Sequence, residues 1–336
     1  MTRVAINGFG RIGRLVFRLM DESDDLEVVA INDLTDAEQL AYLLKYDTNH
    51  RNYRVNDISN DENNIIVGDK KIRVFAETDP TNLPWKDMNI DIVFECTGRF
   101  TNKDSAYSHI SAGAKKVIIS APAKGDLKTI VYNVNDDTLD GSEEVISAAS
   151  CTTNCLAPVV NVINNKFGIV KGYMTTVHAY TNDQVILDVA HKKGILARRG
   201  RAGAANIVPS STGAASALGL VIPSLQGKLD GSALRVPTST GSVIDLTLEL
   251  ERNVTVDEIN DEFKNNTNET LGFTMDPIVS SDIIGSLYGG LVDGLLTSIL
   301  EVDGKQLVKI VAWYDNEMSY SAQMVRTAKC LSKFIK

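Results

Sequence analysis

The sequence has 336 residues, 43% hydrophobic and 23% charged, and a formal net charge of −9. This length exceeds one typical domain and predicts two, and the acidic balance argues against nucleic acid as the main partner, because such binding needs a basic face. No apolar run approaches the roughly 20 residues that a membrane helix needs, so we expect a cytoplasmic protein with no membrane partner.

Short apolar strands alternate with helical segments in the first 120 residues. The pattern predicts a helix over Arg11–Met20 and strands over Val4–Asn7, Glu27–Asn32, Ile90–Glu95 and Lys116–Ser120. The polar segment Asn52–Asn64 is expected to be an irregular insertion or a hairpin. Strand–helix alternation of this kind predicts an α/β domain built on a doubly wound parallel sheet.

A glycine motif of the form G-x-G-x-x-G joins the first predicted strand to the first helix. Its glycines are Gly8, Gly10 and Gly13, and Asp33 follows the second strand, 20 residues after Gly13 (33 − 13). Glycines at these places allow a tight turn and close approach of a pyrophosphate to the helix N-terminus. A carboxylate at Asp33 would accept hydrogen bonds from the adenosine ribose and repel a 2′-phosphate. The motif in this context predicts an NAD site.

After about residue 150 the pattern becomes richer in long strands. It predicts helices over Thr152–Phe167 and Ser319–Ile335 and strands over Gly172–Thr181, Ser242–Glu251, Thr297–Val302 and Leu307–Tyr314. We expect an α+β catalytic domain over 150–315 with a mostly antiparallel sheet. The NAD-binding domain would comprise 1–149 and 316–336.

The segment Ser150-Cys151-Thr152-Thr153-Asn154-Cys155 carries a candidate nucleophile. Cys151 lies at the start of a predicted helix, where the helix dipole would stabilise a thiolate, whereas Cys155 would be a core thiol or an oxidation partner. His178, at the end of a predicted strand, is the candidate base. The four cysteines form no C-x-x-C and are too sparse for a disulfide scaffold, so we expect reduced thiols and no metal site. The other histidines, His50, His109 and His191, are expected at the surface.

Five motifs together resemble glyceraldehyde-3-phosphate dehydrogenase of the phosphorylating type. They are N-G-F-G-R-I-G-R, S-C-T-T-N-C, H-A-Y-T-N-D-Q, S-S-T-G-A-A and W-Y-D-N-E, and the resemblance runs from Val4 to the final helix. It implies a homotetrameric glycolytic enzyme whose Cys151 attacks the aldehyde of glyceraldehyde-3-phosphate while His178 takes the thiol proton. Hydride transfer to NAD would leave a thioester, which inorganic phosphate would cleave to 1,3-bisphosphoglycerate.

The resemblance also implies which residues bind the ligands. Two anions, the substrate phosphate and the attacking phosphate, would be held by Ser150, Thr152, Thr181, Arg198, Thr212, Gly213 and Arg235. Cofactor contacts would come from the three glycines and from Arg11, Ile12, Asp33, Ser120 and Asn316. Arg235 lies in an apolar strand, and a buried arginine needs an anionic partner.

Three departures from the family pattern leave details open. The loop His191–Arg201 looks longer than in many relatives, so the phosphate-binding arginine could be Arg198 or Arg199. Val189-Ala190 replaces a common Leu-Pro near the ribose, and Glu77-Thr78 replaces a site that is often basic near the adenine. The tolerance for NADP therefore stays open. The sequence also leaves the physiological direction open.

Two alternatives remain beside the main interpretation. A paralogue that oxidises erythrose-4-phosphate, with water rather than phosphate resolving the thioester, would share the S-C-T-T-N core. A binding protein that kept the fold and lost the chemistry would be expected to lack the nucleophile or the base, and both Cys151 and His178 are present.

Overall fold

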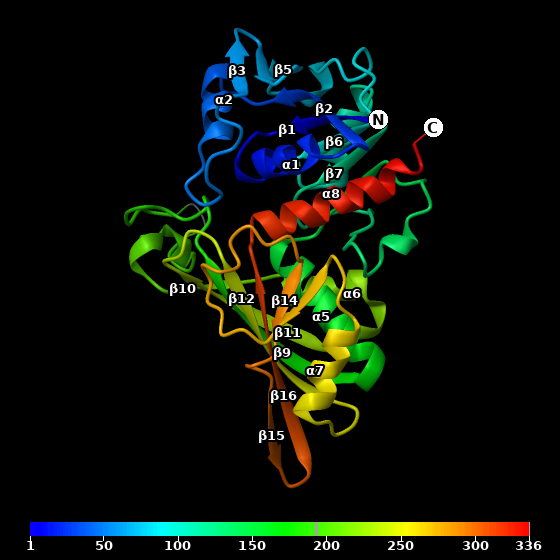
Figure 1. Ribbon diagram of the computed structural model, residues 1–336, viewed down its shortest axis with the longest axis vertical. Coiled ribbons are helices and arrows are strands. Elements are labelled where there is room, and N and C mark those ends of the chain that lie inside the picture. The colour runs from blue at the N-terminus through cyan, green and yellow to red at the C-terminus, as the bar shows by residue number, and fades with distance from the viewer. Residues whose placement is uncertain (192–193, 336) are drawn as a thin grey trace. The chain divides into compact units, whose positions relative to one another are not determined.

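The computed structural model describes residues 1–191 and 194–335. Its contacts divide the chain into two compact units. The first unit comprises Met1–Ser150 and the C-terminal segment from Ser321, and the second comprises Cys151–Tyr320 (Figure 1). Helix α8 (Met318–Ser332) carries the chain from the second unit back into the first. In the described residues, no helix has the length and apolar character needed to cross a bilayer.

The first unit is built on one sheet. Its strands, in sheet order, are β3 (Ile58–Asp61), β4 (Asn64–Val67), β5 (Lys70–Phe75), β2 (Leu26–Asn32), β1 (Thr2–Asn7), β6 (Ile92–Glu95), β7 (Lys116–Ile119) and β8 (Val145–Ser147). From β5 to β8 neighbouring strands are parallel, and β3 and β4 add antiparallel pairs. The predicted doubly wound parallel sheet is confirmed, and the polar segment 52–64 contributes to a hairpin.

Helices follow the strands of this first unit, as parallel pairing requires. They are α1 (Arg11–Asp21), α2 (Ala37–Lys45), α3 (Lys103–Ala106) and α4 (Ser108–Ser111). Buried side chains of β6 and β7, such as Val93 and Val117, form a core with Trp85. The sheet therefore has a rigid carboxyl edge on which polar side chains can be placed.

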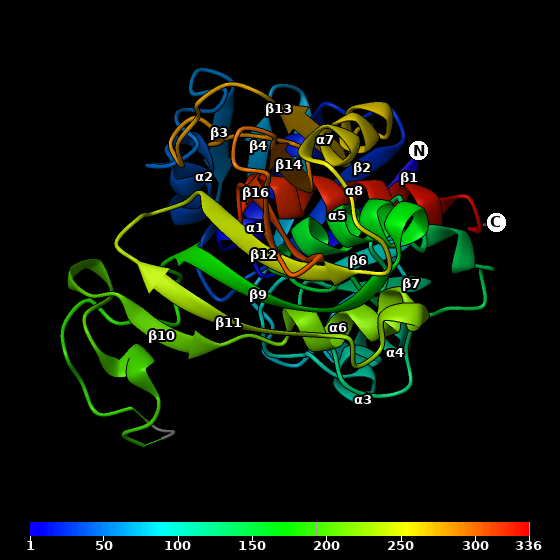
Figure 2. The same cartoon turned by 90° about the horizontal axis from the view of Figure 1, so that it is seen from below.

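A second sheet belongs to Cys151–Tyr320. Its strands, in order, are β10 (Val208–Ser211), β11 (Leu229–Val236), β9 (Ile169–Ala179), β12 (Ser242–Leu250), β16 (Lys305–Tyr314), β14 (Gly290–Asp293) and β13 (Leu271–Thr274), and β15 (Ser298–Val302) pairs with β16. Only β11 with β9 and β13 with β14 are parallel among the described pairs. Helices α5 (Cys151–Phe167), α6 (Ala214–Val221) and α7 (Val256–Asn265) lie along one face (Figure 2). The predicted α+β unit with a mostly antiparallel sheet is confirmed.

One expectation about the histidines is wrong. His109 was expected at the surface, but its side chain is fully buried in α4. The ring lies between the aromatic side chains of Trp85 and Phe100, with centroid distances of 6.4 Å and 6.2 Å. Polar partners at both ring nitrogens offset the cost of burial. His50 and His191 are half-buried.

Candidate functional site

The glycine motif of the first unit forms a turn that excludes side chains. Gly8 has a φ of +93°, and a Cβ there would lie 2.7 Å from the amide nitrogen of Thr97. A Cβ at Gly13 would lie 2.1 Å from the carbonyl oxygen of Gly8. Gly10 caps α1 without a side-chain hydrogen bond and has open space where a Cβ would be, so a ligand can approach the backbone there.

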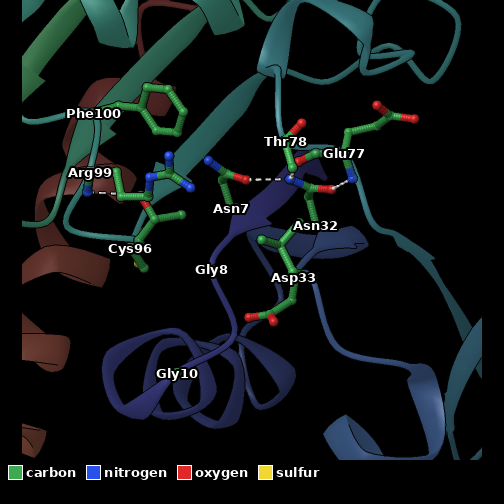
Figure 3. A pocket seen from close by; sticks show the side chains of 12 residues that line it. Asn7, Gly8, Gly10, Asn32, Asp33, Glu77, Thr78, Cys96, Arg99 and Phe100 are labelled. Carbon is green, nitrogen blue, oxygen red and sulfur yellow. Dashed lines mark hydrogen bonds between the residues drawn. The ribbon is translucent and has the colours of Figure 1, made fainter. Parts of the chain in front are cut away.

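A cavity of about 270 Å³ opens beside this turn (Figure 3). Its lining includes Asn7, Gly8, Gly10, Asn32, Asp33 and Thr97. The Asp33 carboxylate accepts hydrogen bonds from the amides of Phe9 (2.7 Å) and Thr35 (3.2 Å), which fix it at the end of β2. A glycine cradle and a fixed carboxylate at the carboxyl edge of a parallel sheet fit the adenosine and pyrophosphate part of a dinucleotide.

The other predicted cofactor residues of the first unit lie around this turn in different ways. The guanidinium of Arg11 pairs with the carboxylate of Asp47, so we expect Arg11 and Ile12 to act through their main-chain N–H groups at the start of α1. Ser120 follows β7, and its amide donates to the carbonyl of Glu95 (2.9 Å). Glu77 and Thr78, the departure noted near the adenine, do line the cavity.

The two predicted catalytic side chains of the second unit lie in contact. Cys151 is the first residue of α5, and His178 is next to the last residue of β9. The Cys151 Sγ lies 3.4 Å from the His178 Nε2. The Nδ1 of the same ring lies 2.7 Å from the carbonyl oxygen of Ala179, which can only accept. This partner assigns the ring proton to Nδ1, so Nε2 presents a lone pair to the thiol.

Burial shifts the pKa values of both members of this pair. Burial raises the pKa of the Cys151 thiol above its ordinary value, although the charge of Arg235 acts in the opposite direction. Burial, followed by the charge of Arg235, lowers the pKa of His178 to about 4. At this helix start burial therefore acts against the thiolate that the helix dipole favours. Since its lone pair faces the thiol, the His178 Nε2 is arranged to take the thiol proton.

Tyr314 is a member of this site that the sequence did not reveal. Its buried hydroxyl lies 2.9 Å from the Thr152 Oγ1 and 2.8 Å from the Thr176 Oγ1. Its ring meets the His178 ring edge to face, with a centroid distance of 5.9 Å. Tyr314 therefore fixes the first turn of α5 against β9 and forms one wall around the imidazole. The only signal was its place in W-Y-D-N-E.

Arg235 lies beside the catalytic pair on β11, opposite His178 in the strand register. Its Nη1 donates to the Thr181 Oγ1 (2.9 Å) and to the carbonyl of Ala179 (3.2 Å). Its buried Nε has no hydrogen-bond partner, and no carboxylate pairs with it in the described residues. A cation in this state favours an anionic ligand.

Arg199 is more closely connected to this arginine than Arg198 is. Arg199 pairs with the carboxylate of Asp183, which also accepts from the Thr181 hydroxyl. The charge of Arg199 contributes to the lowered pKa values of His178 and Arg235. Arg198 is exposed and has no ion pair within the described part of the chain, although both arginines line a cavity of about 780 Å³. Lys192 and Lys193 of the same loop lie outside the described residues.

The remaining predicted residues of the second unit lie at the ends of elements. Thr212 and Gly213 precede α6, where Gly213 caps the helix without a side-chain hydrogen bond and the Thr212 Oγ1 accepts from the Ala214 amide (3.2 Å). Asn316 is buried, and its Oδ1 accepts from the Ser242 hydroxyl (3.0 Å) and the Gly241 amide (3.1 Å). These donors fix the orientation of its side-chain amide. Ser150 immediately precedes α5 and ends the first unit.

Comparison with known proteins gives consistent matches over the whole chain. A family model described as "Glyceraldehyde 3-phosphate dehydrogenase, NAD binding domain" matches residues 2–103, and the model of the C-terminal domain matches residues 150–316. Proteins named glyceraldehyde-3-phosphate dehydrogenase are 59% identical in Clostridium pasteurianum, 58% in Clostridium acetobutylicum and 56% in Streptococcus pyogenes. Each similarity covers 100% of this chain and 100% of the relative.

Proposed function

Because the chain belongs to the glyceraldehyde-3-phosphate dehydrogenase family, we propose that it oxidises glyceraldehyde-3-phosphate with NAD and inorganic phosphate to 1,3-bisphosphoglycerate and NADH. It is an oxidoreductase of that family with NAD as its cofactor. The observation that supports the chemistry best is the 3.4 Å contact between the Cys151 Sγ and an Nε2 whose lone pair faces the thiol. We place the reaction in the cytoplasm, as a step of glycolysis.

The proposed reaction uses the two parts of the chain for different tasks. We assign the cofactor to residues 1–149 and 316–336 and catalysis to 150–315, in keeping with the two matched family models. His178 accepts the thiol proton at Nε2 as the Cys151 Sγ attacks the aldehyde carbon, and a hemithioacetal forms. The protonated Nε2 can then donate to the oxygen that was the carbonyl oxygen. Because the pKa of His178 is lowered to about 4, its protonated ring is a stronger acid than an ordinary imidazolium and gives the proton readily to that oxygen.

The cofactor is held by groups that the chain already orients. NAD, when bound, would supply the acceptor for the hydride that leaves the hemithioacetal carbon. The hydroxyl proton returns to the His178 Nε2 as the hydride leaves, and a thioester remains on Cys151. Gly8, Gly10 and Gly13 would admit the pyrophosphate to the start of α1, and the fixed carboxylate of Asp33 would accept from the ribose hydroxyls. We assign the nicotinamide amide to the NH2 group of Asn316, whose Oδ1 is already occupied by the Gly241 amide and the Ser242 hydroxyl.

The thioester is cleaved by inorganic phosphate. Its oxygen attacks the thioester carbon, the carbon–sulfur bond breaks, and Cys151 leaves as a thiolate that His178 reprotonates. We assign phosphate binding to the predicted set of Ser150, Thr152, Thr181, Thr212, Gly213 and Arg235. From the loop we assign Arg199 instead of Arg198, because the contacts of Asp183 and Thr181 link Arg199 to Arg235. Guanidinium forks and hydroxyls suit tetrahedral phosphate oxygens.

Phosphate dependence tests this function directly. We expect NADH formation from glyceraldehyde-3-phosphate to rise with inorganic phosphate and to saturate. The Arg199→Ala variant should raise the KM for phosphate by roughly ten- to a hundredfold, as expected for loss of one charge-assisted contact of about 1.5–3 kcal/mol. Initial rates measured by absorbance of NADH over a phosphate series would give the KM for phosphate of the wild type and of the variant.

Arg198→Ala is the matched control, because it removes the same charge from the adjacent residue of the same loop. Its KM for phosphate should stay within about twofold of the wild type, as for a solvated surface charge. A larger effect of Arg198→Ala than of Arg199→Ala would reverse the assignment. A rate that ignores phosphate and prefers erythrose-4-phosphate would favour the paralogous function over ours.

We also propose that the chain assembles as a homotetramer. Large apolar side chains of the segment 186–207 are exposed in the single chain, among them Ile186, Leu187, Ile195, Leu196 and Ile207. Clusters of this kind are typical of surfaces that another chain covers. Light scattering coupled to size exclusion should give four times the mass of one chain, and a monomeric mass at micromolar concentration would contradict the proposal.

A further inference from the structure

Three neighbouring strands of the first sheet end in polar residues that lie side by side. β2, β1 and β6 end in Asn32, Asn7 and Glu95, and the register pairs Asn7 with both of the others. All three side chains are at least 96% buried. In doubly wound sheets the carboxyl edge is where ligands bind. A row of buried polar groups under that edge therefore calls for a functional explanation.

Glu95 is the acceptor at the centre of this row. Its Oε1 accepts from the amide of Thr97 (2.8 Å) and from the Thr97 hydroxyl. Its Oε2 accepts from the Asn7 Nδ2 (2.5 Å) and lies 3.2 Å from the His109 Nε2. Both oxygens thus act only as acceptors for buried donors, and an ionised carboxylate is the side chain that can satisfy all of them.

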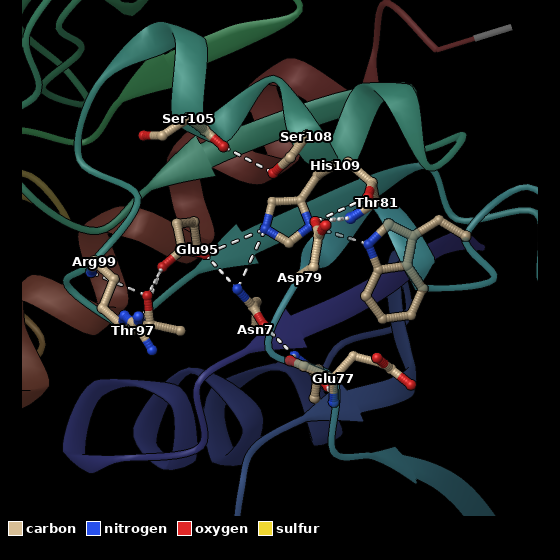
Figure 4. Close-up of polar contacts among 12 residues, drawn as sticks. Asn7, Glu77, Asp79, Thr81, Glu95, Thr97, Arg99, Ser105, Ser108 and His109 are labelled. Atoms are coloured by element: carbon tan, nitrogen blue, oxygen red, sulfur yellow. Dashed lines mark hydrogen bonds and ion pairs between the residues drawn. The ribbon is translucent and has the colours of Figure 1, made fainter.

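His109, from α4, holds Glu95 at the Oε2 (Figure 4). The indole Nε1 of Trp85 lies 3.1 Å from the His109 Nδ1, and an indole can only donate. The Nδ1 must therefore accept, which assigns a proton to Nε2 and makes the ring a donor to Glu95. The imidazole is completely buried and connects a core tryptophan to the carboxylate.

The network continues from Glu95 to the wall of the dinucleotide cavity. The Asn7 Oδ1 accepts from the Asn32 Nδ2 (2.7 Å). Asn32 in turn accepts from the amide of Glu77 (2.8 Å) and donates to its carbonyl (3.0 Å). Asn7, Asn32, Glu77 and Thr97 all line the cavity, and the Thr97 amide nitrogen is the atom that a Cβ at Gly8 would meet most closely. Both arms of the Glu95 network thus end in cavity walls.

We propose that Glu95, held by His109, is a positioning residue for the adenosine end of NAD. It does not line the cavity itself. It fixes Thr97 against the glycine turn, and through Asn7 and Asn32 it fixes the backbone of Glu77. Burying a carboxylate is costly, whereas an apolar side chain would close the sheet edge at lower cost, so the network is better explained by the walls that it orients. The inference rests on the proposed use of NAD.

The Glu95→Gln variant tests this role, because an amide offers one acceptor and one donor. Whichever way the amide turns, its NH2 group meets N–H donors, either those of His109 and Asn7 or that of Thr97. We expect the dissociation constants of NAD and of ADP-ribose to rise by about tenfold, the factor for about 1.4 kcal/mol of lost hydrogen bonding. The value of kcat at saturating NAD should stay within about twofold. Calorimetric titration and initial rates would give these values.

Two further variants separate positioning from general stability. Glu95→Asp keeps two acceptor oxygens and should recover part of the lost affinity. Glu143→Gln changes another largely buried carboxylate of the same unit, which pairs with Lys128 and accepts from the Gly141 amide but does not line the cavity. It should bind ADP-ribose as the wild type does. If Glu95→Gln does not fold, His109→Phe, which removes the imidazole donor to the Glu95 Oε2, should weaken ADP-ribose binding with kcat preserved.

The outcomes distinguish the two proposals. A folded Glu95→Gln with wild-type affinity for ADP-ribose would overturn the positioning role. The role would also be overturned if Glu143→Gln lost as much affinity for ADP-ribose as Glu95→Gln does. If His109→Phe were measured instead, an unchanged affinity for ADP-ribose would likewise overturn the positioning role. A wild-type protein that binds neither NAD nor ADP-ribose would instead contradict the proposed function on which the inference depends.

Discussion

Replacement of Cys151 by serine is expected to lower kcat for NADH formation by roughly four orders of magnitude or more, as removal of a covalent nucleophile does in other enzymes. The serine hydroxyl has a far higher pKa than a thiol, and the neutral Nε2 of His178, with a pKa of about 4, is too weak a base to ionise it. Binding of NAD should be unchanged, because the glycine turn and Asp33 belong to the first unit. Single-turnover rates and NAD titrations would separate the two effects.

Cys155→Ala is the matched control for the nucleophile. Cys155 lies one helical turn further along α5, and its thiol is completely buried, with its Sγ 4.0 Å from the carbonyl oxygen of Ala312. Burial raises the pKa of this thiol well above the ordinary value, so it stays protonated and unreactive. Cys155→Ala should therefore retain kcat within about threefold and lose about 1 kcal/mol of stability or less, as a small cavity would cause. Full activity in Cys151→Ser together with inactivity in Cys155→Ala would reverse the roles.

The sequence predicted the fold class because periodicity and motif order are local. The run from Val4 through the glycines to Asp33 is contained in one strand–helix–strand unit, and it gave both the parallel sheet and the cofactor type. Element ends were less certain, because strands end where pairing ends. β9 begins at Ile169, earlier than expected, since Ile169 pairs with Leu250 of β12.

The charge states of the site could not be predicted in the same way. A cysteine at a helix start suggested a thiolate, but the pKa of Cys151 depends on burial by segments distant in sequence. Tyr314 lies 162 residues from Thr152, with which it shares a hydrogen bond. His109 was misassigned for the same reason, because its partners Trp85 and Glu95 come from other elements. The residues adjacent to His109 in the sequence do not indicate that Trp85 or Glu95 contacts it.

The division of roles between Arg198 and Arg199 is a further case. The two are identical side chains next to each other, so no pattern distinguishes them. In the fold, Arg199 pairs with the carboxylate of Asp183, from the segment after β9, and our assignment of Arg199 rests on that contact. A contact of this kind, between segments distant in sequence, is what a local pattern cannot predict.

Replacement of His178 by asparagine is expected to lower kcat/KM by about 10²- to 10⁴-fold, the usual contribution of a positioned general base. Its pH dependence should also change. In the wild type His178 is neutral above its pKa of about 4, so its protonation should not limit the rate at neutral pH. In the variant the thiol must ionise unaided, and its pKa is raised by burial. The rate should therefore rise by about tenfold per pH unit through the alkaline range.

The low pKa of His178 also makes the free energy of unfolding depend on pH, which gives a second measurement besides activity. An unfolded histidine binds a proton near pH 6.5, whereas folded His178 does so only near pH 4, so the unfolded state binds more protons in between. The free energy of unfolding of the wild type should fall as the pH falls from about 6.5 to about 4. In urea titrations, His178→Asn should lose this dependence of the free energy of unfolding on pH. His50 is half-buried and lies outside the catalytic pair, so His50→Asn should retain both the wild-type pH dependence of stability and the wild-type rate profile. A variant with a flat rate profile would show that another group takes the thiol proton.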